Sequence, residues 1–133
     1  MVYANFDFKV YYSSKEAKQK SLVQYVLNKI ERSKNSNAIL KDMSIEHIYP
    51  ETPSRKWQPI KNELVKNIGN LVLLDKGINS DIGNKTYEEK RGIILSQSQL
   101  ISTKEVFTSE EWTEQIILER NAEIKKYLYD LNE

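Results

Sequence analysis

The chain has 133 residues, a length that predicts one domain large enough to enclose a hydrophobic core. Its composition, 39% hydrophobic and 29% charged, is typical of soluble globular proteins, and no run of about 18 apolar residues predicts a membrane span. The absence of cysteine excludes disulfides and thiolate zinc sites. The first twelve residues lack the basic start and the apolar block of a signal peptide, so we expect a cytoplasmic protein that does not enter the membrane.

The net charge of +1 favours no class of partner, but the charges are distributed unevenly. Residues 1–91 contain 16 Lys and Arg against 11 Asp and Glu, whereas residues 92–133 contain 4 against 8. This asymmetry has two interpretations. It indicates either a basic working face with an acidic element packed elsewhere, or the ordinary charge of solvated helix faces.

The first third of the chain predicts an extended segment followed by a helix. Aromatic and polar residues alternate from Val2 to Tyr12, which favours a strand or an extended arm. Ser13 with Glu16 has the spacing of a capping box at a helix start. Apolar residues then recur at steps of three and four up to a polar turn cluster at 33–37, namely Leu22, Val23, Val26, Leu27 and Ile30. The abrupt start also suggests the C-terminal part of a longer protein.

The middle of the chain predicts two short strands separated by a loop. Met43 to Tyr49 has the pattern of the first strand, and the prolines that follow prevent regular structure. We expect a loop from Glu51 to Asn67 with a helical turn around Ile60 to Val65. A Gly-Asn turn signal then precedes Leu71 to Leu74, an apolar run of strand length.

Trp57 lies in this loop and has two interpretations. A large aromatic side chain at such a place usually anchors the loop over the core, and it can also stack on a nucleic-acid base. The first interpretation is favoured here.

The remainder of the chain predicts helices. We expect a short helix or helical turn from Lys76 to Ile82, and a second helix from Thr86 to Leu95 whose outward face carries Lys90 and Arg91. Ser96 to Thr103 is expected to be a loop. Thr108 has a glutamate three residues later, Glu111, which predicts the start of a last helix that runs to about Leu131. The predicted fold class is α+β.

Candidate site chemistry gathers between residues 44 and 79. The single histidine, His47, follows Glu46, and Asn70 and Asn79 lie at the start of the second strand and just after it. Because side chains alternate along a strand, Glu46 and His47 should point to opposite sides. Imidazole can take a proton from water at neutral pH. Carboxylate and amide oxygens suit Mg²⁺ or Mn²⁺, whereas one histidine without cysteine disfavours zinc.

These residues form a pattern. The chain reads Glu46-His47-Ile48-x-Pro50, then Gly69-Asn70-Leu71-x-Leu73-Leu74, then Asn79, then Tyr87-x-x-Lys90. The pattern resembles the HNH (His-Asn-His) nuclease domain at the C-terminus of GmrSD-type, modification-dependent (Type IV) restriction proteins. The resemblance is concentrated in residues 40–95, within a single domain that covers residues 1–133. It implies a ββα-metal hairpin–helix core inside a mostly helical shell.

The resemblance also implies roles for individual residues. His47 corresponds to the general base that activates water for attack on a phosphodiester. Glu46 and Asn79 take the positions of metal ligands for one Mg²⁺ or Mn²⁺, and Asn70 takes that of the residue that braces the loop and orients His47. The chain departs from common HNH enzymes in two ways, because Glu46 replaces aspartate and Asn79 replaces the last histidine.

DNA is the implied substrate, and a role in restricting phage or other foreign DNA is expected. Five further residues are candidates for DNA contacts, namely Lys76, Asn84, Lys85, Lys90 and Arg91. The resemblance implies a partner as well, an N-terminal nucleotide-hydrolysing recognition domain or subunit outside this chain. An alternative is an inactive HNH-fold module that binds nucleic acid or a partner protein.

Overall fold

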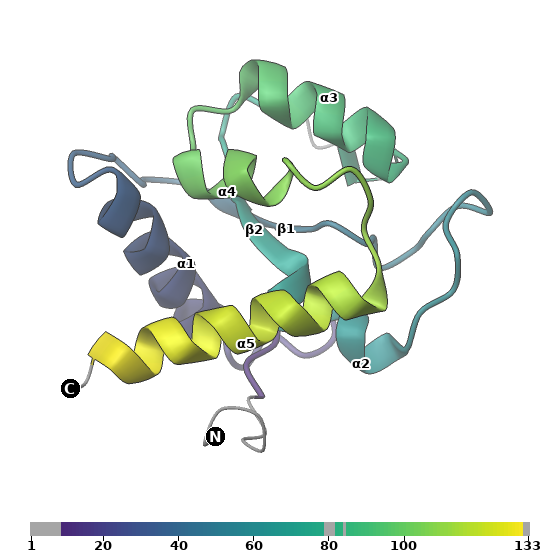
Figure 1. Cartoon of the computed structure of the whole chain (residues 1–133), viewed down its shortest axis with the longest axis horizontal. Coiled ribbons are helices and arrows are strands. Elements are labelled where there is room, and N and C mark those ends of the chain that lie inside the picture. Colours follow the sequence, from purple (N-terminus) through teal and green to yellow (C-terminus); the bar gives the residue numbers. More distant parts are fainter. Residues whose placement is uncertain (1–8, 79–81, 84, 132–133) are drawn as a thin grey trace.

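The computed structural model describes residues 9–78, 82–83 and 85–131 (Figure 1). The elements are α1 (Lys20–Lys34), β1 (Ser44–His47), α2 (Asn62–Val65), the short 3₁₀ helix η2 (Ile68–Asn70), β2 (Leu71–Leu74), α3 (Tyr87–Gln97), α4 (Ile101–Val106) and α5 (Glu114–Leu131). Within the described residues, five α-helices surround a small antiparallel sheet of two strands, so the predicted α+β class is confirmed. The ββα-metal core stays a prediction, because residues 79–81 and 84 lie outside the described part.

The strand β2 divides the hydrophobic core into two clusters. It pairs with β1 in the register Ser44↔Leu74 to His47↔Leu71, and all four of its residues are buried. Because side chains alternate along a strand, Leu71 and Leu73 pack with α1 and α5, whereas Val72 and Leu74 pack with α3 and Phe107. An unbroken apolar run is therefore what a strand covered on both faces requires.

The helices cover the two sides of this hairpin. In Figure 1 the strands lie between α3 and α4 on one side and α5 on the other, with α1 beside β2 and α4. The helix α5 packs along η2 and α2. Among the helices described, none combines the length and the apolar character needed to cross a bilayer.

The N-terminal helix begins later than the capping-box spacing predicts. Ser13 and Glu16 form a closed turn instead, in which the Glu16 backbone N–H donates to Ser13 Oγ at 3.0 Å, and α1 starts at Lys20. Before this turn, Tyr11 forms an isolated antiparallel bridge with Asn67. The predicted extended arm is thus present at its C-terminal end, while residues 1–8 lie outside the described part.

Residues 76–78 form a turn, which the expected helix or helical turn at Lys76 to Ile82 allows, and residues 79–81 lie outside the described part. Two other expectations for the second half are wrong. The expected loop from Ser96 to Thr103 contains the end of α3 and the start of α4, whose first backbone N–H groups donate to the buried carboxylate of Glu31 on α1. The last helix starts at Glu114, because Thr113 Oγ1, and not Thr108, accepts a first-turn N–H, that of Ile116 at 3.3 Å.

Candidate active site

His47 is the last residue of β1 and is buried, with its side chain held on one edge by the N-terminal segment. Its Nε2 lies 2.9 Å from the carbonyl oxygen of Tyr12, and the Tyr12 ring stacks on the imidazole with the ring centroids 5.8 Å apart. A carbonyl oxygen can only accept a hydrogen bond, so Nε2 carries the proton and donates it. In the neutral ring, Nδ1 therefore keeps the lone pair, which makes Nδ1 the basic atom.

A pocket of about 300 Å³ opens beside this histidine. Its lining comes from β1, from the turn that follows β1, and from two distant segments represented by Tyr12 and Gly83. Glu46, His47 and Glu51 all line it, so a base and two carboxylates border one space. The pocket thus has the chemical groups that water activation requires.

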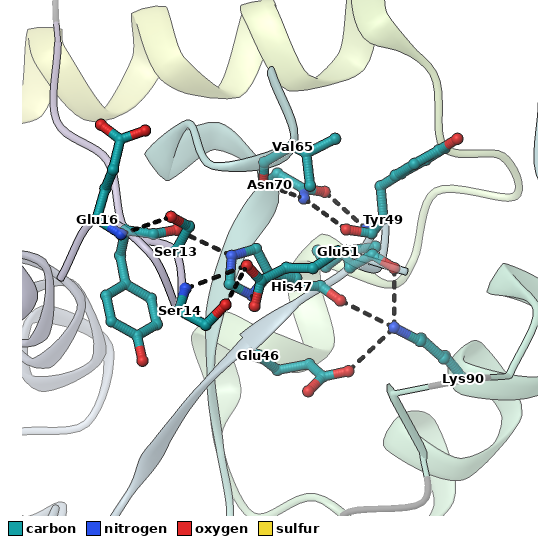
Figure 2. Close-up of polar contacts among 12 residues, drawn as sticks. Ser13, Ser14, Glu16, Glu46, His47, Tyr49, Glu51, Val65, Asn70 and Lys90 are labelled. Atoms are coloured by element: carbon teal, nitrogen blue, oxygen red, sulfur yellow. Dashed lines mark hydrogen bonds and ion pairs between the residues drawn. The ribbon is translucent and has the colours of Figure 1, made fainter. Parts of the chain in front are cut away.

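Asn70 is fully buried and uses all of its hydrogen-bonding capacity. Its Oδ1 accepts from the Tyr49 backbone N–H at 2.8 Å and from Trp112 Nε1 at 2.9 Å. Its Nδ2 donates to the carbonyl oxygens of Tyr49 at 2.9 Å and Val65 at 2.7 Å (Figure 2). One side chain therefore ties together the segment after His47, the end of α2 and the segment before α5.

Lys90 is completely buried, which corrects the expectation that it lies on the outer face of its helix. Its Nζ donates to Glu46 Oε2 at 3.0 Å and to the carbonyl oxygens of His47 at 2.8 Å and Ile48 at 2.9 Å (Figure 2). Burial lowers the pKa of this ammonium group, and the Glu46 carboxylate opposes that shift. All three of its protons are thus committed inside the protein, so Lys90 supports β1 from within.

Arg120 supports the neighbouring loop in a similar way. Its guanidinium donates to the carbonyl oxygens of Ile68 and Gly69 at 3.1 Å each and to that of Leu71 at 2.6 Å. These carbonyls flank Asn70, and a Cβ atom added to Gly69 would overlap the Ile117 carbonyl of α5. The loop that carries Asn70 is therefore pressed directly against α5.

The other predicted site residues are dispersed. Asn79 and Asn84 lie outside the described residues. Lys76 is exposed and lies 3.7 Å from Asp42, near the end of the hairpin opposite His47. The Lys85 carbonyl accepts from Trp57 Nε1, and the Arg91 side chain donates to the Phe107 carbonyl at 2.9 Å. Arg91 is thus partly used within the fold.

Trp57 packs as an anchor. It is half-buried against the cluster around α3, and its ring meets that of Tyr49 edge-on with the centroids 4.9 Å apart. This contact supports the interpretation that was favoured from the sequence.

Sequence reasoning missed two of the groups around His47, Tyr12 and Glu51. Tyr12 contributes a backbone carbonyl, a group that every residue has, so the residue type at position 12 does not predict this contact. Glu51 stands four residues after His47. That spacing predicts neighbouring side chains on a helix, but here it spans a strand end and Pro50, so it gave no reason to pair the two residues. Neither group could be found without the path of the chain.

The described residues only partly supply a metal site. Among them, no group of three His, Asp or Glu side chains is placed to hold a metal ion. Mg²⁺ needs fewer protein ligands, since it commonly binds one or two carboxylates and completes its coordination shell with water and substrate phosphate. Glu46 lines the pocket and has one oxygen paired with Lys90, so its other oxygen offers the hard ligand that Mg²⁺ or Mn²⁺ prefers.

Comparison with known proteins connects this arrangement to a family. A search of curated proteins found no match. Residues 3–127 match the family described as GmrSD restriction endonucleases, C-terminal domain. The match includes Tyr12, both strands, Asn70, Lys90 and most of α5, and so spans every group around His47 described above. The chain therefore belongs to the family of C-terminal domains of GmrSD restriction endonucleases.

Proposed function

We propose that this domain is a metal-dependent DNA endonuclease of the HNH type in which His47 is the general base. The observation that carries the proposal is the Tyr12 carbonyl on Nε2, since it leaves the basic Nδ1 on a ring that borders the pocket. Membership of a restriction endonuclease family supports DNA as the substrate and the removal of foreign DNA as the purpose. An N-terminal nucleotide-hydrolysing domain or subunit remains the proposed partner.

The reaction is hydrolysis of a phosphodiester bond. Nδ1 of His47 takes one proton from water, and the water oxygen forms a bond to phosphorus as the bond to the 3′ oxygen breaks. The 3′ oxygen leaves and takes up a proton from solvent, which gives a 3′ hydroxyl and a 5′ phosphate. Asn70 fixes the backbone of Tyr49, two residues after His47, and so keeps the imidazole in place.

Glu46 and Asn79 are the proposed ligands of the metal. A bound Mg²⁺ or Mn²⁺ would supply charge that stabilises the phosphate and the leaving oxygen. Lys90 holds the carboxylate of Glu46 and the carbonyl of His47 together, so the ligand and the base share one support.

For contact with the DNA backbone we propose Lys76, Lys85 and Asn84, with Arg91 as a weaker candidate. The Lys76 side chain is 74% exposed at the end of the hairpin away from His47. If Lys76 binds one phosphate, Lys76→Gln should reduce the slope of log affinity against log salt by about 1. A slope equal to that of the unmodified chain would remove Lys76 from the interface.

The test is nicking of supercoiled plasmid by the 133-residue chain with Mg²⁺ or Mn²⁺, with EDTA as the metal-free control. We expect cleavage by the wild type, and none by His47→Ala or His47→Gln. The glutamine variant is included because its amide can still donate to the Tyr12 carbonyl and so preserves the fold without a base. Cleavage by either variant at the wild-type rate would exclude His47 as the base, and cleavage in EDTA would exclude the metal. DNA binding without any cleavage would favour the alternative, an inactive binding module.

A further inference from the structure

Glu51 is held in a fixed position although it lies at the surface. It follows Pro50 directly, and its Oε2 accepts hydrogen bonds from both the backbone N–H and the Oγ of Ser14, each at 3.1 Å (Figure 2). Ser14 belongs to the closed turn that precedes α1. One oxygen of Glu51 is thus anchored by a segment 37 residues away, and this anchor sets the direction of the other.

The second oxygen, Oε1, faces the basic atom of His47. The distance from Oε1 to Nδ1 is 3.9 Å, which exceeds hydrogen-bonding distance. Both atoms are acceptors when the imidazole is neutral, because Nε2 holds the ring proton. Two facing acceptors need a donor with two hydrogens between them, and both residues border the same pocket.

A water molecule fits this requirement. A typical hydrogen bond from water spans about 2.8 Å, so one water beside the line from Nδ1 to Oε1 can donate to both atoms. We infer that Glu51 and His47 together bind the water that attacks the phosphodiester, and that Glu51 is a catalytic residue. This inference rests on the proposed function, and it adds a residue outside the motif that carries the family resemblance.

The two acceptors do different things in the reaction. Nδ1 of His47 takes one proton of the water as its oxygen attacks phosphorus. Glu51 Oε1 accepts a hydrogen bond from the other O–H, which stays intact during the attack and leaves with the 5′ phosphate. Glu51 therefore orients the water, and Ser14 acts one step further out as a positioning residue that orients Glu51.

Glu46 and Glu51 consequently have separate roles at the same pocket. Glu46 is paired with Lys90 and is the proposed metal ligand, whereas Glu51 is paired with Ser14 and faces the base. A measurement of metal affinity separates these roles without reference to cleavage. Calorimetry with Mn²⁺ should show wild-type affinity for Glu51→Gln and a reduced affinity for Glu46→Gln.

The test of the inference is steady-state cleavage by Glu51→Gln, Glu51→Ala and Ser14→Ala, with Glu63→Gln on the exposed face of α2 as the matched control. In Glu51→Gln, the amide oxygen can replace Oε2 at Ser14, which turns the NH₂ group toward Nδ1 and blocks its lone pair. We expect kcat to fall about 100-fold in both Glu51 variants with KM for DNA unchanged, since misplacement of a reacting group costs about that much. Ser14→Ala should show a smaller loss, also in kcat.

Three results would overturn the inference. Wild-type kcat in both Glu51 variants would remove Glu51 from the reaction, and a rise in KM alone would make it a DNA contact. A loss of Mn²⁺ affinity in Glu51→Gln as large as that in Glu46→Gln would make it a metal ligand. In each of these cases the wild-type chain still cleaves and the proposed function stands, whereas failure of the wild type to cleave would remove both together.

Discussion

The ammonium group of Lys90 lies 2.8 Å from the carbonyl oxygen of His47, so a buried cation on α3 holds the backbone of the proposed base. The same group pairs with Glu46 and with the Ile48 carbonyl. Lysine is rarely buried completely, because removing its ammonium group from water is unfavourable. Here every ammonium proton has a hydrogen-bond acceptor, which offsets that desolvation.

Removing this ammonium group should therefore destabilise the protein strongly. Lys90→Met preserves most of the length and the apolar stem of the side chain but leaves the Glu46 carboxylate, which is only 14% exposed, without its partner. We expect a loss of about 3–5 kcal/mol in the free energy of unfolding, measured by urea denaturation. Lys76→Met is the control, since Lys76 is 74% exposed and should change stability by less than about 0.5 kcal/mol. Equal stability of the two variants would show that Lys90 does not support the fold.

Asn70→Asp tests the network around the buried asparagine. The substitution preserves the shape of the side chain but replaces Nδ2 with an oxygen. In the wild type, Nδ2 donates hydrogen bonds to the carbonyls of Tyr49 and Val65, so the new oxygen would face two acceptors. A buried acceptor that faces acceptors should cost about 3 kcal/mol at neutral pH. The matched variant is Asn62→Asp at the exposed first position of α2, where a carboxylate suits the helix dipole. A loss confined to Asn70→Asp is the expected result in thermal unfolding, and similar values for both would contradict it.

Two glycine substitutions should act in opposite directions. Gly69→Ala would push a Cβ atom into the Ile117 carbonyl, so α5 must move away from the loop that carries Asn70. Gly92→Ala lies within α3 with nothing near its Cβ position, and alanine is the better helix former. We expect Gly69→Ala to unfold at lower temperature than the wild type and Gly92→Ala to be more stable by up to about 1 kcal/mol. A Gly69→Ala variant with wild-type stability would show that the contact is not tight.

The buried hydroxyl of Tyr87 should cause the stability of the protein to fall as the pH rises above 10. Burial raises the pKa of its hydroxyl from 10.0 to about 12 in the folded state. Between these values the unfolded chain has lost the proton and the folded chain still holds it, so stability falls as pH rises. The difference in unfolding free energy between wild type and Tyr87→Phe should therefore shrink from pH 10 to pH 12. A constant difference across this range would contradict the raised pKa.

The sequence predicted those parts of the fold that depend on contacts between residues close together in the chain. The strand at Leu71–Leu74 was predictable because burial on both faces leaves an unbroken apolar run in the sequence. The helix expected from Thr86 to Leu95 is also present, as α3 (Tyr87–Gln97). The start of α4 was not, since its N–H groups are satisfied by Glu31, which is 70 residues earlier. The start of α5 was misplaced because Thr108 has the capping-box spacing with Glu111, whereas Thr113, which accepts the N–H of Ile116, has no Glu or Gln at that spacing.

The candidate site was likewise predictable only where it depends on residues close together in the chain. The motif located His47, Glu46 and Asn70 because their residue types and spacing are distinctive. Charge suggested an outward Lys90, yet the buried acceptors at the end of β1 attract it inward. The anchor of Glu51 on Ser14 and the carbonyl of Tyr12 join segments far apart in sequence, and no local pattern encodes such meetings.

The hydrogen bond from Trp112 to Asn70 also has a consequence for synthesis of the protein on the ribosome. The segment that contains His47 and Asn70 emerges well before Trp112 and Arg120, which complete the support of the Asn70 loop. A nascent chain thus contains His47 and Asn70 before it contains the residues that complete these hydrogen bonds. The loop around Asn70 therefore reaches its final set of hydrogen bonds only after Trp112 and Arg120 have been synthesised.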